Sequence, residues 1–262
     1  MTTQTSPAWL TLHSVRLEVV ERGQGRPILW LHGEEGLDPE APFLNLLAGC
    51  GRVIAPSHPG FGHSPDADGI DTVDDLAYLY LDLLAERDAR DAVVMGASLG
   101  GWIAAALAVK CTGRIGRLVL VAPLGIKVGD RETRDIPDIW ALDPDEVLGL
   151  QYADPSWAAA DYTALSEDQV TVIARNREAT ALYGWEPYFH DPKLRRRLHR
   201  IDVPTLLLWG AADRFVTPDS YGAAYRSAIP GAGLETIDRA GHFPHLERPE
   251  AFVERLAAFL GT

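Results

Sequence analysis

The most chemically suggestive stretch of this 262-residue chain is Gly96-Ala97-Ser98-Leu99-Gly100, which follows a short apolar run. An Ala-rich helical pattern begins directly after it, so the sequence predicts a strand, a very tight turn and a helix. Such a turn holds a serine in strained backbone geometry, with its hydroxyl exposed above a sheet. The flanking glycines lack a Cβ, which lets the strand and the helix approach closely. Ser98 is therefore the candidate nucleophile.

A serine hydroxyl needs a base, usually a histidine, which a carboxylate in turn orients. In an open α/β sheet these groups lie in loops at the carboxyl ends of the strands. Asp213 follows the apolar run 205–209, although an aspartate there could also simply cap its own turn. His242 follows the final apolar run. We prefer it to His245 because Gly241 frees the backbone to turn the imidazole inward, whereas His245 is expected to face away, towards the closing helix.

The negative charge of a tetrahedral intermediate requires preorganised hydrogen-bond donors. One donor would be the backbone N–H of Leu99, directly after the nucleophile. The second is assigned to the backbone N–H of Glu34, in the loop after the apolar run 28–31, with Glu35 as the fallback. A carboxylate here is unusual, so the Glu34 side chain must point away from the oxyanion or be protonated. Alternatively, both acids are simply solvated loop residues.

The elements that must position these residues alternate between strands and helices. Two segments with alternating polarity, 9–13 and 15–21, predict an antiparallel edge hairpin. Further strands are expected at 28–31, 52–55, 92–97, 118–122, 203–209 and 233–237, and most of them contain apolar runs typical of strands buried on both faces. Helical patterns separate them, at 39–48, 71–87, 102–109, 219–229 and 248–260. This order favours a mostly parallel sheet covered on both faces.

The alternation stops between residues 123 and 200, where no buried-strand pattern occurs. We predict a helical cap or lid insertion over residues 123–200, between two parts of a core domain, 1–122 and 201–262. Two helix starts are expected, near 143–146 and 166–169. We expect most of the aromatic residues of the insertion to pack in its own small core. These residues are Trp140, Tyr152, Trp157, Tyr162, Tyr183, Trp185, Tyr188 and Phe189.

The composition narrows the range of partners. A formal net charge of -13 argues against nucleic acid and anionic membranes as partners.

Cys50 and Cys111 are expected to be buried free thiols. Segment 1–7 is polar and contains no apolar stretch of signal-peptide length, and no apolar run in the sequence approaches membrane-spanning length. We therefore expect a cytoplasmic protein. No Cys/His spacing suggests a metal site, and no glycine spacing suggests a dinucleotide, so no metal and no cofactor are expected.

Five motifs together resemble those of the α/β-hydrolase superfamily. They are Leu31-His32-Gly33, Pro59-Gly60-Phe61-Gly62-His63-Ser64, Gly96-Ala97-Ser98-Leu99-Gly100-Gly101, Gly210-Ala211-Ala212-Asp213 and Gly241-His242. The resemblance implies a mostly parallel, eight-stranded sheet with helices on both faces. It also implies a helical cap after the sixth strand and a catalytic triad in the order Ser, Asp, His.

Within the superfamily, the nucleophile separates reaction classes. Epoxide hydrolases and haloalkane dehalogenases use aspartate, so Ser98 argues against both. Carbon–carbon bond hydrolases of the meta-cleavage type share the triad, but many carry Trp after the histidine where this chain has Phe243. We therefore expect a carboxylic ester hydrolase that acts on a small-molecule, ester-like substrate. The alternatives are a carbon–carbon bond hydrolase, which the resemblance also allows, and a non-enzymatic ligand receptor on the same scaffold.

Overall fold

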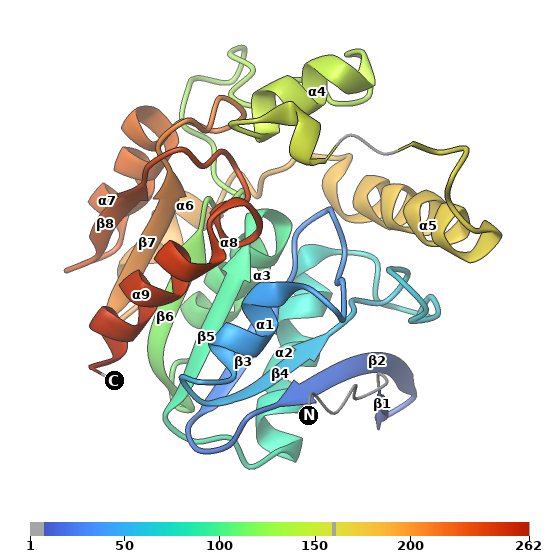
Figure 1. Ribbon diagram of the computed structural model, residues 1–262. Helices are drawn as coiled ribbons and strands as arrows, with labels where there is room; N and C mark the ends of the chain where they lie inside the picture. The colour runs from blue at the N-terminus through green and yellow to red at the C-terminus, as the bar shows by residue number, and fades with distance from the viewer. Residues whose placement is uncertain (1–7, 159–160, 262) are drawn as a thin grey trace.

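An eight-stranded sheet runs through the computed structural model, which describes residues 8–158 and 161–261 (Figure 1). Its strands are β1 (Ala8–Leu12), β2 (Val15–Arg22), β3 (Pro27–Leu31), β4 (Arg52–Pro56), β5 (Ala92–Ala97), β6 (Ile115–Val121), β7 (Thr205–Gly210) and β8 (Gly233–Ile237). The strand order is β1-β2-β4-β3-β5-β6-β7-β8. Only the β1–β2 and β2–β4 pairs are antiparallel among these strands. The predicted sheet and its antiparallel edge hairpin are both confirmed.

Helices cover both faces of this sheet (Figure 1). The helices of the described residues are α1 (Pro42–Leu47), α2 (Val73–Glu86), α3 (Ser98–Lys110), α4 (Pro144–Gln151), α5 (Glu167–Gly184), α6 (Leu194–Arg197), α7 (Ala223–Ala228), α8 (Pro244–Glu247) and α9 (Pro249–Leu260). Of these, α4 and α5 lie beyond one end of the sheet and not on its faces. Short 3-10 turns span Pro155–Trp157 and Leu198–Arg200, and a π turn spans Pro218–Gly222. The helix predicted over 39–48 is therefore shorter than expected.

Successive residues of β5 enter two separate hydrophobic cores, because side chains alternate across a strand. Val94 packs in the core that contains α2 and α3. Val93 and Met95 pack in the core on the opposite face, with Phe43 of α1 and Phe252 of α9. Every residue of β5 is buried, as a solid apolar run predicts.

The starts of α2, α4 and α5 are fixed by local sequence. Each has a capping box, in which the residue before the helix and the third helical residue satisfy each other's backbone N–H groups. The pairs are Thr72 with Asp75, Asp143 with Glu146, and Ser166 with Gln169. These are the helix starts that the sequence predicts.

The turn from β5 into α3 has the expected strained geometry. Ser98 has φ +49°, in the left-handed region that non-glycine residues rarely adopt. A Cβ on Gly96 would lie 2.1 Å from the carbonyl oxygen of Gly100. A Cβ on Gly100 would lie 2.1 Å from the carbonyl oxygen of Leu31. Both glycines are therefore required for close backbone approach, and the turn holds Ser98 at the end of β5.

The segment between β6 and β7 is helical and contacts the loops at the carboxyl ends of the strands. Asn176 of α5 accepts a hydrogen bond from Gly62 N–H, at 2.8 Å, and donates one to the Glu35 carbonyl, at 3.0 Å. The neighbouring Arg175 donates to the carbonyls of Gly62 and Ser64, at 2.8 and 2.7 Å. These long-range bonds fix α5 to both loops.

Two expectations about burial are wrong. Four of the eight aromatics between β6 and β7 are exposed rather than packed in a core: Trp140, Trp157, Tyr162 and Trp185. In Figure 1, α4 and α5 lie beyond one end of the sheet and not between other layers, so part of each helix faces outward. Cys111 is also exposed and Cys50 is half-buried, although both are free thiols as expected.

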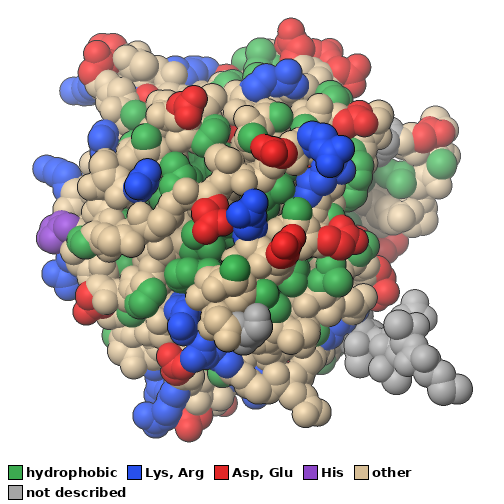
Figure 2. Space-filling model, turned by 60° about the vertical axis from the view of Figure 1, so that its left-hand side comes forward, with side chains coloured by type: hydrophobic (Ala, Val, Ile, Leu, Met, Phe, Trp, Pro, Cys, Tyr) green, Lys and Arg blue, Asp and Glu red, His purple; other side chains and the backbone are tan. Residues whose placement is uncertain are grey.

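No helix among the described residues is both long and apolar enough to cross a membrane. On the face of the molecule shown in Figure 2, Lys and Arg side chains are interspersed with Asp and Glu and do not gather into one basic patch. This distribution gives that face no concentrated positive field for attracting a polyanion.

The close approach at Gly100 generates a stability prediction. Gly100→Ala should lower the free energy of unfolding by about 1–3 kcal/mol or more, because the new Cβ overlaps backbone atoms that cannot move away. Gly149→Ala in α4 is the matched control, since a Cβ added at that position would meet nothing within 4 Å. It should be neutral or stabilising by about 0.5–1 kcal/mol. Urea denaturation of both variants tests this, and equal stability of the two would contradict it.

Candidate active site

Ser98, His242 and Asp213 meet at one edge of the sheet, in the loops that follow β5, β8 and β7. The Nε2 atom of His242 lies 2.8 Å from the Ser98 Oγ. The Nδ1 atom of the same ring lies 2.9 Å from Oδ2 of Asp213. All three side chains are buried. The structure thus joins the three predicted residues in one hydrogen-bonded series, with a hydroxyl, an imidazole and a carboxylate in the order that nucleophilic catalysis requires.

The carboxylate of Asp213 is held by four donors. Its Oδ1 accepts hydrogen bonds from the backbone N–H groups of Phe215 and Val216, at 2.9 and 3.1 Å. Its Oδ2 accepts from His242 and also from the indole Nε1 of Trp209, at 3.0 Å. Sequence reasoning missed Trp209, because an aromatic residue at the end of a buried strand has the same pattern as ordinary core. The indole fixes the orientation of the carboxylate towards His242.

The loop that carries His242 is tied to the segment between β6 and β7. The backbone N–H of His242 donates to the Gln151 carbonyl at 2.5 Å. The Glu247 carboxylate accepts from Gly241 N–H at 2.6 Å and from Ala153 N–H at 2.9 Å. A Cβ on Gly241 would lie 2.3 Å from the Gln151 carbonyl oxygen. Gly241 is therefore needed for this close approach, and not for a special backbone angle as the sequence suggested.

His245, the rival base, lies away from the nucleophile. Its ring packs against the aromatic rings of Trp30 and Phe43, each with a centroid distance of 4.9 Å. Its Nε2 lies 3.6 Å from Oε1 of Glu35. Burial, together with the nearby charge of His242, lowers the pKa of His245 to about 3. The preference for His242 as the partner of Ser98 agrees with this geometry.

The loop after β3 lies directly against the nucleophile. A Cβ on Gly33 would lie 3.0 Å from Cβ of Ser98. A tight turn closes the loop, with Gly36 N–H donating to the Gly33 carbonyl at 3.2 Å. His32 joins this loop to the loop after β4, because its Nε2 accepts a hydrogen bond from the backbone N–H of His58 at 3.0 Å. Glu34 follows Gly33, so its backbone N–H belongs to the loop that faces Ser98. Leu99 is the second residue of α3, whose first N–H groups lack partners within the helix.

The Glu34 side chain does not point away from the site. Its Oε1 lies 4.0 Å from Nε2 of His242 and accepts a hydrogen bond from Nε2 of Gln151 at 2.9 Å. Only 10% of the side chain is exposed. Burial, and then the charge of Glu35, raise the pKa of Glu34 against the lowering effects of His242 and the Ser98 hydroxyl. Of the two sequence alternatives, a side chain that points away from the site is therefore wrong.

Glu35 is also close to the site rather than free in solvent. Its Oε1 accepts from Gly33 N–H at 3.1 Å. Burial raises the pKa of Glu35 to about 7, although its own N–H and that of Gly33 oppose the shift. The interpretation of Glu34 and Glu35 as solvated loop acids is therefore wrong. Side-chain direction in a turn depends on packing partners that the local sequence does not reveal.

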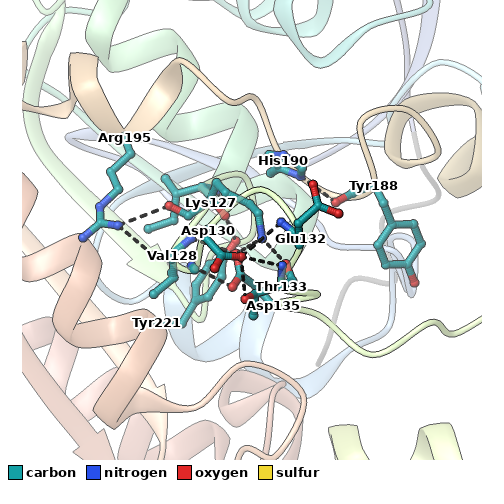
Figure 3. Close-up of polar contacts among 12 residues, drawn as sticks. Lys127, Val128, Asp130, Glu132, Thr133, Asp135, Tyr188, His190, Arg195 and Tyr221 are labelled. Atoms are coloured by element: carbon teal, nitrogen blue, oxygen red, sulfur yellow. Dashed lines mark hydrogen bonds and ion pairs between the residues drawn. The ribbon is translucent and has the colours of Figure 1, made fainter.

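A separate hollow of about 350 Å³ adjoins the loop after β7. Its walls include Phe215, whose ring contacts the His242 ring at a centroid distance of 5.0 Å, edge to face. On the other side lies the loop that contains Val128 and Asp135. Figure 3 shows how polar contacts brace this loop: Asp135 accepts from the Lys127 ammonium at 2.9 Å and from Val128 N–H at 2.8 Å. These contacts join the two ends of the loop that forms one wall of the hollow.

Comparison with known proteins agrees with this architecture. A family model described as "Alpha/beta hydrolase family" matches residues 28–255. A pimeloyl-[acyl-carrier protein] methyl ester esterase from Photobacterium profundum is 30% identical, over 91% of this chain and 96% of that protein. A 2-hydroxy-6-oxononadienedioate/2-hydroxy-6-oxononatrienedioate hydrolase from Cupriavidus pinatubonensis is 28% identical, over 89% and 82% of the two chains.

Solved structures share the fold. A serine hydrolase from the polyaromatic hydrocarbon-degrading bacterium Cycloclasticus zankles superposes with a TM-score of 0.80 over 97% of each chain. The sequence identity is 20%, so this likeness concerns the fold alone. The sheet order and the helical segment after β6 are therefore compatible with known hydrolase architecture.

The electrostatics of the site generate a prediction for His242. Burial lowers its pKa, but the charge and hydrogen bond of Asp213, and then the charges of Glu34 and Glu35, outweigh burial and raise it overall. Glu34→Gln removes one raising charge, so the pKa of His242 should fall and its neutral form should persist to lower pH. Glu40→Gln, on an exposed side chain, is the control. Titration of the histidine ring by NMR checks this. An unchanged or higher His242 pKa in Glu34→Gln would contradict it.

Proposed function

Since this chain belongs to the alpha/beta hydrolase family, we propose that it is a serine hydrolase that cleaves carboxylic esters through an acyl-enzyme on Ser98. The observation that carries this proposal is the continuous series from Ser98 Oγ to His242, at 2.8 Å, and from His242 to Asp213, at 2.9 Å. These distances are those at which an imidazole can take the proton of a serine hydroxyl while a carboxylate fixes its tautomer.

In the proposed reaction, Ser98 Oγ attacks the acyl carbon while Nε2 of His242 takes the hydroxyl proton. Asp213 stabilises the resulting imidazolium. His242 then delivers the proton to the alcohol oxygen as the ester C–O bond breaks, which leaves the acyl group on Ser98. In the second half, His242 takes a proton from water as the water attacks the acyl carbon, and it returns that proton to Ser98 Oγ.

The backbone N–H groups of Leu99 and Glu34 are proposed to hold the oxyanion. Leu99 lies in the first turn of α3, where free N–H groups and the positive end of the helix dipole favour negative charge. Glu34 lies in the loop packed against Ser98. Burial raises the pKa of the Glu34 carboxyl, which lessens its opposition to negative charge on the oxyanion.

Residues 123–200 are proposed to act as a cap domain over a core formed by 1–122 and 201–262. Support comes from the helices between β6 and β7 and from their direct contacts with the catalytic loops. Gln151 bonds to both His242 and Glu34, and Asn176 bonds to the loop of Glu35. Because Ser98 is buried and this segment bonds to the loops around it, the cap would control the entry of a small-molecule substrate.

Carbon–carbon bond cleavage is the second candidate, because one relative named above is a hydrolase of a 2-hydroxy-6-oxo dienedioate type. Ester hydrolysis is preferred because the relative with 30% identity is a methyl ester esterase. Phe243, where many meta-cleavage hydrolases carry Trp, also favours the ester. Faster turnover of a vinylogous diketone than of any short aryl ester would reverse this preference.

The nucleophile gives the most direct prediction. Wild-type protein should hydrolyse p-nitrophenyl esters of short acyl acids and should be labelled by a fluorophosphonate on Ser98. Ser98→Ala should lose both, with kcat reduced about 10⁴-fold or more. Peptide mapping of the labelled serine and stopped-flow kinetics check this. A wild-type protein with neither turnover nor a covalent adduct would indicate a ligand receptor instead of an enzyme.

The role of Asp213 gives a second prediction. Asp213→Asn should keep the fold but reduce kcat about 10³- to 10⁴-fold, because an amide can favour the wrong imidazole tautomer and cannot stabilise the imidazolium. Trp209→Phe is a milder variant, since it removes only one of the four donors to Asp213. It should reduce kcat by a much smaller factor. If Asp213→Asn retained more than about a tenth of wild-type kcat, Asp213 would not be the orienting carboxylate.

A further inference from the structure

The carboxyl group of Glu34 has an unused hydrogen-bonding capacity beside the triad. Its Oε1 is fixed by Gln151, at 2.9 Å. Its Oε2 is buried and has no hydrogen-bond partner among the described residues. Buried polar atoms in proteins are nearly always hydrogen-bonded, so an unpaired oxygen leaves this carboxyl able to bind a polar ligand.

The position of this carboxyl relative to His242 defines where such a ligand would sit. Nε2 of His242 and Oε1 of Glu34 are 4.0 Å apart. Two atoms at that separation share points about 2.9 Å from each. A carboxyl oxygen can accept two hydrogen bonds, so Oε1 can still bind a small molecule beside its bond from Gln151, and that molecule can also contact Nε2. Nε2 is also the atom that must remove a proton from water when the acyl group leaves Ser98.

Water fits this position better than the leaving alcohol does, because water has two hydrogens and the alcohol has one. A water molecule that gives one hydrogen to Nε2 has a second hydrogen that requires an acceptor in this buried place. The alcohol oxygen of an ester carries no hydrogen until His242 protonates it. The alcohol therefore leaves with a single O–H group, and no second hydrogen needs an acceptor. An acceptor on the Glu34 side of this position therefore serves the incoming water and not the leaving alcohol.

We propose that Glu34 is a further catalytic residue, which binds the hydrolytic water together with His242 during release of the acyl group. The inference rests on the acyl-enzyme proposed above. In this step His242 Nε2 takes one proton of the water, and the oxygen forms a bond to the acyl carbon. The second hydrogen stays bonded to that oxygen and is donated to Glu34 as a hydrogen bond. The C–O bond to Ser98 then breaks, His242 returns the proton to Ser98 Oγ, and the free acid leaves.

The surroundings of Glu34 suit this role. The carboxyl accepts a hydrogen bond in either protonation state, through its carbonyl oxygen or its carboxylate. Gln151 acts as a positioning residue, since its side-chain amide sets the direction of the Glu34 carboxyl while its carbonyl holds the backbone of His242.

A purely structural role for Glu34 predicts something different. If its only purpose were to join α4 to the loop after β3, loss of the carboxyl would disturb the whole site. Acylation and release of the acyl group would then slow together. The proposed role instead confines the loss to the second half of the reaction, and the two halves can be measured separately.

The experiment uses the full chain and p-nitrophenyl acetate. Stopped-flow release of p-nitrophenolate measures acylation. Deacylation is measured by acylating the protein, removing the ester and following loss of the acetyl group by intact mass. Glu34→Met removes the acceptor at similar size, and it should slow deacylation about tenfold or more while acylation changes less than about threefold. Glu34→Gln retains a carbonyl acceptor and should lose less. Thermal unfolding establishes that both variants are folded.

Two further variants sharpen the test. Gln151→Leu leaves Glu34 in place without its anchor and should slow the same step by a smaller factor. Glu40→Met makes the same chemical change on an exposed side chain nearby and should alter neither step. Equal slowing of both steps in Glu34→Met, or unchanged deacylation, would overturn the inference. Failure of the wild type and all variants to form any acyl-enzyme would overturn the proposed function, and this inference with it.

Discussion

Ser98 lies in a left-handed backbone conformation, at φ +49°, between two glycines whose positions leave no room for a side chain. This turn fixes the hydroxyl at the end of β5, in the centre of the sheet. The other catalytic candidates must therefore come to it. They do so because β7 and β8 continue the same parallel sheet, and their carboxyl ends open onto the same edge. The strain at one residue and the register of the sheet together determine where the site is.

The imidazole is positioned from two directions. The Asp213 carboxylate, itself held by four donors, sets the orientation of the ring. Gln151 and Glu247 set the backbone of its loop and join that loop to the helical segment after β6. The alignment of His242 with Ser98 is therefore coupled to the position of this segment. Any movement of the segment that admits a ligand must preserve or restore these backbone contacts.

The two acids of the loop after β3 give the site its particular character. Both are largely buried, both have raised pKa values, and both act on His242 through space. Burying two carboxyls beside a base is costly unless protonation or a hydrogen-bonded ligand compensates. Their position beside Ser98 therefore does not favour the stability of the fold, and we interpret it as serving the chemistry of the site. It links the pKa of His242 to two residues outside the hydrogen-bonded series of Ser98, His242 and Asp213.

The sequence by itself determined the sheet, the capped helix starts and the three hydrogen-bonded residues Ser98, His242 and Asp213, because these depend on local periodicity, local capping and strand-to-loop order. Tertiary structure alone decided the direction of Glu34, the support from Trp209 and Glu247, and the exposure of half the aromatics after β6. The bond between Gln151 and Glu34 joins positions 117 residues apart. No local pattern encodes such a contact, since side-chain direction and burial depend on which distant surface packs against each residue.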